Sequence, residues 1–201
     1  MFYMKQTPRW VCFRFRVWTC TVFHVKQQFK KLALEYAKSL DLFGPSVQRD
    51  FDHHYDLSLK YGHFLPQGTH LLDVGSGGGL PGIPLALERP DLSLYLCEIR
   101  QRKAAFLNTA VSKLKLENVQ VFSGNVRNFP YTVSWVTAQA VAEVSELVKM
   151  LDHVVEDEWH LITRRSSSWT LPIIKKYSIT EERRPLEPDT DLIHLILRRT
   201  A

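Results

Sequence analysis

Several chemistries lack the residues that they would need in this chain. Its 201 residues include only three cysteines, without the C-x-x-C spacing of metal or redox sites, which indicates a reducing compartment. No apolar run reaches the roughly 18 residues of a membrane span. His53, His54, His63 and His70 have no cysteine or carboxylate at recognised zinc spacing, so we predict no metal. No Ser-His-Asp, Cys-His or paired-carboxylate arrangement stands out either.

The bulk composition is that of a globular protein with one domain. Hydrophobic residues make up 45% and charged residues 23% of the chain, which are ordinary values. A chain of 201 residues suits one domain with a sizeable core. The net charge of +5 is compatible with a polyanionic partner but does not demand one. We expect no membrane contact and a monomer.

Acidic residues are absent before Glu35, and five basic residues fall within residues 1–26 among many aromatics. Three interpretations stay open: an N-terminal extension of unknown role, a targeting segment, or a stretch translated from a misassigned start. Organellar transit peptides are acid-poor but also Ser-rich, and this stretch has few serines. We favour the misassigned start, because the composition changes abruptly at Gln27. The predicted location is cytoplasmic, or mitochondrial or plastid if residues 1–26 are a transit peptide.

The remaining chain, residues 27–201, is predicted to form one α/β domain. A helix over residues 27–40 and a second one that Ser46 begins form an N-terminal helical cap of residues 27–62. Strands and helices then alternate, which predicts a mostly parallel sheet. A short turn between the last two strands suits an antiparallel edge. The seven predicted strands are residues 70–74, 93–98, 119–122, 133–137, 158–163, 176–181 and 192–198, and the helices among them are residues 82–89, 101–115 and 141–154.

A dense glycine turn follows the first predicted strand. Residues 71–82 read Leu-Leu-Asp-Val-Gly-Ser-Gly-Gly-Gly-Leu-Pro-Gly, with a helical stretch after them. Strand, glycine turn and helix are the arrangement that holds a nucleotide-like cofactor. A dinucleotide site requires a third small residue at the position of Leu80. The spacing instead reads G-x-G-x-G, from Gly75 through Gly77 to Gly79, preceded by Asp73. It resembles motif I of the class I S-adenosylmethionine-dependent methyltransferases, which have a Rossmann-like fold.

An acidic residue closes the second predicted strand at Glu98. In nucleotide-binding folds an acid roughly 20 residues beyond the glycine turn accepts hydrogen bonds from the ribose hydroxyls. We therefore predict that Glu98 binds the ribose of the cofactor.

The extended glycine turn is specific enough to indicate a family. Asp-Val-Gly-Ser-Gly-Gly-Gly-Leu-Pro-Gly-Ile-Pro-Leu, residues 73–85, closely resembles the ribosomal RNA small subunit methyltransferase G family, also called the glucose-inhibited division protein B family. The resemblance covers roughly residues 27–199. Further segments that resemble the family are His53 with Asp56, Arg102-Lys103, Phe106-Leu107, Leu114 to Val119, and His194 to Leu197.

This resemblance implies methyl transfer from S-adenosylmethionine to N7 of one guanine in small-subunit ribosomal RNA. The substrate would be that RNA or an assembling small subunit. Guanine N7 already carries a lone pair, so the reaction needs positioning rather than a general base. The resemblance assigns cofactor binding to Asp73, Gly75, Gly77, Gly79, Leu80, Glu98, Val126 and Arg127. Val126 and Arg127 would flank the adenine, and Asp73 would anchor the turn.

The chain departs from the family pattern on and after the fourth predicted strand, and also in the loop after the third strand (Asn125 to Arg127) and after the fifth (Arg164-Arg165). Ser134 replaces an acidic residue, and Gln139 replaces an arginine near the methyl group. Glutamine supplies neither the charge nor the planar fork of arginine. Gln139 is the candidate catalytic position. The alternative function is a ribosome assembly or RNA-binding factor that kept the fold and lost turnover. A small-molecule methyltransferase is a third interpretation, which the basic balance disfavours.

Basic residues near the predicted cofactor site are candidates for RNA contact. Arg100, Arg102 and Lys103 begin a helix, and Arg164 and Arg165 follow the fifth strand. Basic residues spread over several loops can follow an RNA backbone. Trp169 lies in a predicted loop, where stacking on a splayed base is possible.

Overall fold

The structure is a computed structural model that describes residues 24–200. The predicted extension therefore lies outside the described residues, except for His24, Val25 and Lys26. These three residues are helical and belong to a helix over residues 24–37, so the helical cap starts before the predicted boundary at Gln27. Within residues 24–200, no helix combines the length and the apolar character that crossing a membrane requires.

Helices and strands alternate after the cap, as the sequence predicts. The helical elements are α2 (Pro45–Arg49), α3 (Phe51–Leu59), η1 (Lys60–His63), α4 (Gly82–Glu88), α5 (Gln101–Leu114), η2 (Val126–Asn128) and α6 (Val144–Leu151). The strands are β1 (His70–Val74), β2 (Ser93–Glu98), β3 (Val119–Ser123), β4 (Val133–Ala138), β5 (Val155–Ser166), β6 (Tyr177–Glu187) and β7 (Thr190–Arg199).

The strands form one seven-stranded sheet in the order β3-β2-β1-β4-β5-β7-β6. The pairs from β3 to β5 are parallel, and β7 runs antiparallel to both β5 and β6. This arrangement confirms the predicted mostly parallel α/β sheet with its antiparallel edge. The order reverses direction at β1 and β4, which are neighbours although five elements separate them in the chain. In open parallel sheets, ligands bind at the carboxyl ends of the strands at such a point.

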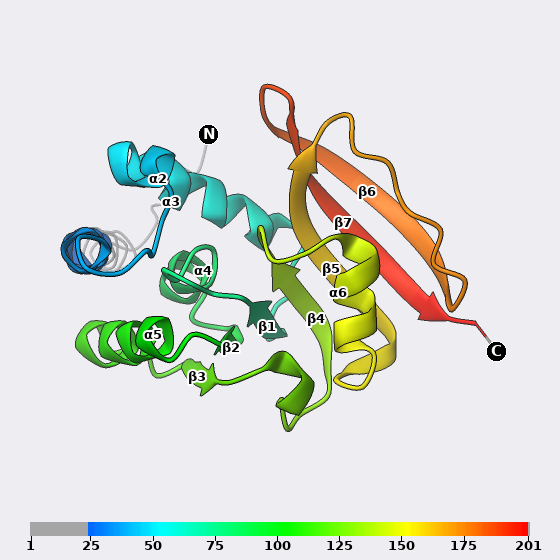
Figure 1. The fold of residues 1–201 in the computed structure, drawn as a ribbon, viewed down its shortest axis with the longest axis horizontal. Coiled ribbons are helices and arrows are strands. Elements are labelled where there is room, and N and C mark those ends of the chain that lie inside the picture. Colours follow the sequence, from blue (N-terminus) through cyan, green and yellow to red (C-terminus); the bar gives the residue numbers. More distant parts are fainter. Residues whose placement is uncertain (1–23, 201) are drawn as a thin grey trace, which may run out of the picture.

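Two apolar cores cover the two faces of the sheet. Leu71 belongs to one core and Leu72 to the other, because successive strand residues point to opposite faces. The first core joins the cap, α4 and α5, and the second joins α6 and η2 (Figure 1). A parallel sheet buried on both faces explains why its strands read as almost continuous apolar runs.

The cap differs from the sequence-based expectation in two respects. Two helices replace the predicted single one, because the backbone of Asp50 leaves the helical region at φ −134° and ψ 68°. The Asp50 carboxylate then accepts a hydrogen bond from the amide of His53 at 3.1 Å, which caps α3. Ser46 does not begin the second helix as predicted. Gly44 is the N-cap of α2, and Pro45 occupies its first turn, where its missing N–H costs nothing.

Candidate functional site

The glycine turn between β1 and α4 has a backbone that glycine alone adopts easily. Gly75, Gly77 and Gly79 have φ angles of +70°, +51° and +89°. The amides of Gly75 and Ser76 donate to the carbonyl of Cys97 on β2, at 2.8 and 3.1 Å. The turn is thus fixed to the neighbouring strand. A methyl group on Gly75 would approach Cγ2 of Val141 to 2.6 Å, so space as well as φ requires glycine there.

The cap lies directly on this turn. A Cβ atom at Gly78 would come within 2.1 Å of the Phe43 ring, so the ring contacts the bare backbone. Neither Gly78 nor Phe43 was predicted from the sequence as a site residue. The run of three successive glycines was a signal for such a close approach, but nothing in the sequence identified the partner.

Asp73 is buried beneath the turn, at the carboxyl end of β1. Its exposed fraction is 1%, and Thr137 of β4 donates a hydrogen bond to Oδ1 at 2.9 Å. The other carboxylate oxygen, Oδ2, is buried without a hydrogen-bond partner. Burial raises the pKa of Asp73 to about 7, although the hydrogen bond from Thr137 opposes the shift. The group can therefore carry charge or stay neutral near physiological pH.

Glu98 closes the turn from β2. The amides of Gly77 and Arg100 donate to its Oε2 and Oε1, at 2.9 and 2.8 Å. A carboxylate oxygen can accept two hydrogen bonds, and each of these oxygens accepts one here, so both can still bind a hydroxyl group. The predicted ribose acid and the glycine turn are therefore one connected unit.

Beside the contact between Phe43 and Gly78, a cavity of about 210 Å³ lies between the cap and the turn, and we call it the first cavity. It brings together the predicted Gly75, Gly77, Leu80, Gln139 and Arg164. The cap residues that line its other side, which include Phe43, His54 and Tyr61, were not predicted from the sequence.

Two of these cap residues shape the polarity of the first cavity. The Tyr61 hydroxyl donates to Oε1 of Gln139 at 3.5 Å, so a cap residue orients the predicted catalytic position. Burial raises the pKa of Tyr61, which stays a neutral donor. Burial and the nearby Arg164 lower the pKa of His54, so this imidazole is mostly neutral at pH 7.

Five predicted cofactor residues do not line the first cavity: Asp73, Gly79, Glu98, Val126 and Arg127. Gly79 is buried under the turn, and its amide donates to the carbonyl of Ser76 at 2.6 Å. Val126 packs in the second core, and Arg127 is exposed beside it on η2. The amide of Gly124, just before them, donates to the carbonyl of Glu98 at 3.0 Å, which holds this loop beside the predicted ribose acid.

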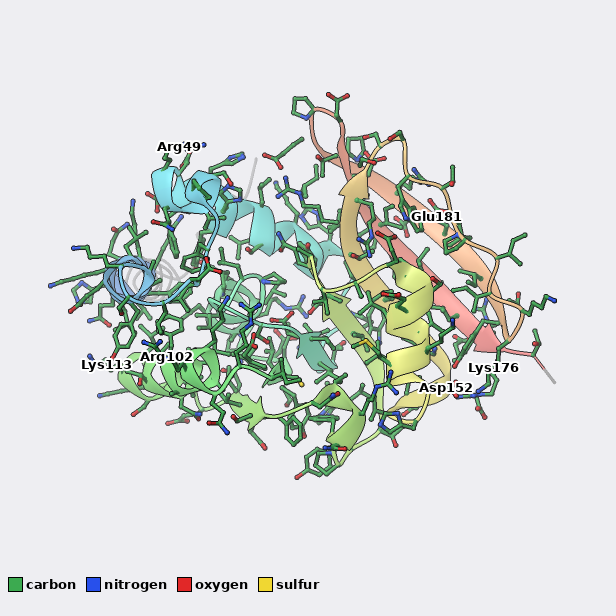
Figure 2. All side chains as sticks on the ribbon, in the orientation of Figure 1. Arg49, Arg102, Lys113, Asp152, Lys176 and Glu181 are labelled. Carbon is green, nitrogen blue, oxygen red and sulfur yellow. The ribbon has the colours of Figure 1, made fainter. Side chains whose placement is uncertain are left out.

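The predicted RNA-binding residues fall into two groups. Arg100, Arg102 and Lys103 line a surface hollow at the start of α5, together with Ser39, Leu40 and Asp41 of the cap. Figure 2 shows Arg102 on α5, on the opposite side of the molecule from Lys176.

Arg164 and Arg165 form the second group, at the carboxyl end of β5. Arg164 forms an ion pair with Glu187, whose other oxygen lies 2.8 Å from Nε2 of His53 in the cap. Arg165 donates from Nη2 to the carbonyl of Ala142 at 2.7 Å. Both arginines also line a second cavity of about 500 Å³, which Trp169 and Glu143 border.

Metal-binding side chains do not cluster in this part of the molecule. Across residues 24–200 there is no group of three or more His, Cys, Asp or Glu side chains arranged to hold an ion.

Comparisons with known proteins indicate a single protein family. A family model described as rRNA small subunit methyltransferase G matches residues 25–168. A Ribosomal RNA small subunit methyltransferase G from Helicobacter pylori (strain HPAG1) is 33% identical over 138 residues, which cover 68% of this chain and 78% of the relative. Its namesake from Acidothermus cellulolyticus is 41% identical over 116 residues, or 57% of this chain and 52% of the relative. The aligned part thus spans about half of that second relative.

Among solved structures, a SAM dependent methyltransferase from Aquifex aeolicus is similar with a TM-score of 0.59 at 16% identity. The match covers 82% of this chain and 98% of that one. This likeness concerns the fold, and it confirms the predicted class I methyltransferase architecture.

Proposed function

Because the chain belongs to the rRNA small subunit methyltransferase G family, we propose that it methylates a base of small-subunit ribosomal RNA with S-adenosylmethionine. The observation that carries the proposal is the joined unit of glycine turn, buried Asp73 and Glu98 at the carboxyl ends of β1 and β2. The proposed target atom is N7 of a guanine. The proposal includes a monomer that works in the cytoplasm.

The residues at the turn fit this cofactor. Backbone without side chains at Gly75 and Gly77 leaves room for a ligand in the first cavity, and Oδ2 of Asp73 is a buried acceptor without a partner. Glu98 would bind the ribose hydroxyls, and Val126 and Arg127 would flank the adenine. When bound, S-adenosylmethionine supplies a methyl group activated by a sulfonium.

The protein's own contribution to the reaction is positioning. Guanine N7 has a free lone pair, so no residue needs to remove a proton before transfer. The cap residues Phe43 and Tyr61 line the first cavity opposite the turn, where they would shield a bound ligand from water. Gln139 lies at the border of both cavities, where its amide can orient the base. In-line approach in a water-poor site is the main catalytic device available here.

A second candidate function rests on Gln139. A neutral amide held by the Tyr61 hydroxyl provides no positive charge at the border of the two cavities. A factor that binds S-adenosylmethionine and the assembling small subunit without transferring the methyl group would not need a positive charge at Gln139.

One assay separates the two functions. The purified chain is incubated with methyl-labelled S-adenosylmethionine and small subunits from cells in which its gene is deleted, and N7-methylguanine is mapped by chemical cleavage. We expect label at a single guanine that is unmethylated in the deletion strain. Binding of cofactor and subunits without label, with activity appearing only in Gln139→Arg, would establish the assembly factor instead.

A further inference from the structure

The second cavity lies next to the first and shares its border. Gln139, Ala140 and Arg164 line both cavities, so a ligand in one is adjacent to a ligand in the other. These residues follow β4 and end β5, the two strands beside β1 on the side away from Glu98. A volume of about 500 Å³ lies in the range of small-molecule sites.

From its lining, we propose that the second cavity holds the target guanine, with Trp169 as its stacking platform and Glu143 as the residue that reads its Watson–Crick edge. This inference rests on the proposed function and adds how the base is recognised.

Trp169 offers an aromatic face that the protein holds in place. Its carbonyl accepts a hydrogen bond from Nη2 of Arg183 at 2.8 Å, and the Arg183 guanidinium carbon lies 5.7 Å from the ring centroid. The side chain is half-buried against the second core, next to Leu171 and Ile174. Bases that leave an RNA strand are commonly bound by stacking on such rings.

Glu143 supplies a carboxylate that the fold does not use. It precedes α6 as the N-cap residue, but its side chain makes no capping hydrogen bond. No ion pair or hydrogen bond to this side chain occurs within residues 24–200, and the residue is exposed at the cavity rim. Arg165 binds the carbonyl of the preceding residue, Ala142, and so fixes the backbone that presents Glu143.

A carboxylate at this place selects guanine on chemical grounds. Among the four RNA bases, guanine alone presents two adjacent donors, N1–H and the N2 amine, on its Watson–Crick edge. A carboxylate accepts both donors with its two oxygens. N7 lies on a different edge of the base, the one that faces the major groove in a duplex. A guanine held by Glu143 therefore leaves N7 free to face the border with the first cavity.

The test uses the full chain and small-subunit RNA that carries either guanine or inosine at the methylated position. Inosine keeps N7 but lacks the N2 amine. For the wild type we expect kcat/KM to be at least tenfold lower with inosine. In Glu143→Gln the amide nitrogen replaces one acceptor, so kcat/KM on guanine falls ten- to hundredfold and the ratio between guanine and inosine approaches one.

Further variants distinguish a loss of base recognition from a general loss of folding or cofactor binding. Glu146→Gln, on the exposed side of the same helix, leaves kcat/KM unchanged. Trp169→Ala lowers kcat/KM at least tenfold, and Trp169→Phe restores most of it. S-adenosylmethionine affinity stays constant in all of these variants, because none of the three residues lines the first cavity.

Two outcomes overturn the inference, and they are distinguishable. If the wild type is active but Glu143→Gln keeps the full preference for guanine over inosine, Glu143 does not recognise the base, and the proposed function stands. A wild type that methylates neither RNA removes the proposed function, and this inference with it.

Discussion

The two halves of the sheet hold their polar groups in different ways. In the β1–β3 half, the buried carboxylates of Asp73 and Glu98 bind backbone amides or a buried threonine, and the turn itself is backbone. In the β4–β7 half, Arg164 and Glu187 are partly exposed and are joined to each other through their side chains. Most of the ion pairs within residues 24–200 involve β5, β6 or β7.

This difference predicts which half tolerates substitution. The direction of a backbone amide is set by the path of the chain, so the β1–β3 half tolerates few changes at Gly75 to Gly79. A contact between two side chains can be replaced one residue at a time. Ser134 and Gln139, two of the departures that the sequence resemblance indicates, lie in the β4–β7 half.

The largest expected effect tests the β1–β3 half through its backbone. Gly75→Ala forces a φ of +70° on alanine and an overlap with Val141, which together cost about 2–5 kcal/mol of unfolding free energy. Because Gly75 lines the first cavity, we expect S-adenosylmethionine affinity to fall at least tenfold in titration calorimetry.

Gly68→Ala is the matched control for this change. Gly68 has a φ of +73° but nothing within 4 Å of an added Cβ, so it reports the backbone strain alone, about 1–2 kcal/mol. Equal cofactor affinity in the two variants would show that the turn does not form the cofactor site.

A second effect is a pH dependence of stability that comes from the buried Asp73. Its folded pKa of about 7 lies above the ordinary value of 3.8, so the protonated form is favoured by folding. The stability that this group contributes is complete below pH 4 and is lost as the pH rises to 7. Asp73→Asn lacks this titration. We expect its unfolding free energy to rise relative to the wild type between pH 4 and pH 7 in urea titrations.

The other titrating groups are the same in both proteins, so their contributions cancel in the difference. Parallel stability curves from pH 4 to pH 8 would show that Asp73 does not carry this pKa. The comparison between the halves would then lose its clearest buried carboxylate.

Sequence patterns predicted elements better than partners. The bounds of β1 and β2 match the prediction, because each strand is an apolar run that ends at a glycine or an acid. The link between Glu98 and Gly77 follows from placing two neighbouring parallel strands side by side.

The contacts made by the cap had no such signal. Phe43 on Gly78 and Tyr61 on Gln139 join residues far apart in the chain, and spacing along a helix does not identify a distant partner. The break at Asp50 was missed because the apolar spacing continues through it. Val126 was assigned to the adenine by resemblance, and its burial in the second core leaves that role a prediction.

The smallest expected effect tests the β4–β7 half through an exposed ion pair. Nε of Arg198 lies 2.6 Å from Oε2 of Glu158, and both side chains are about half exposed, at 48% and 52%. Water screens such a pair, so Glu158→Gln should lower the unfolding free energy by less than about 1 kcal/mol, and the difference should vanish near 1 M salt. Cofactor affinity should not change. A loss above about 2 kcal/mol that persists in salt would mean that side-chain pairs in this half are as indispensable as the backbone of the turn. The contrast between the β1–β3 half and the β4–β7 half would then be wrong, because a substitution in an exposed ion pair would lower the unfolding free energy as much as a substitution at Gly75.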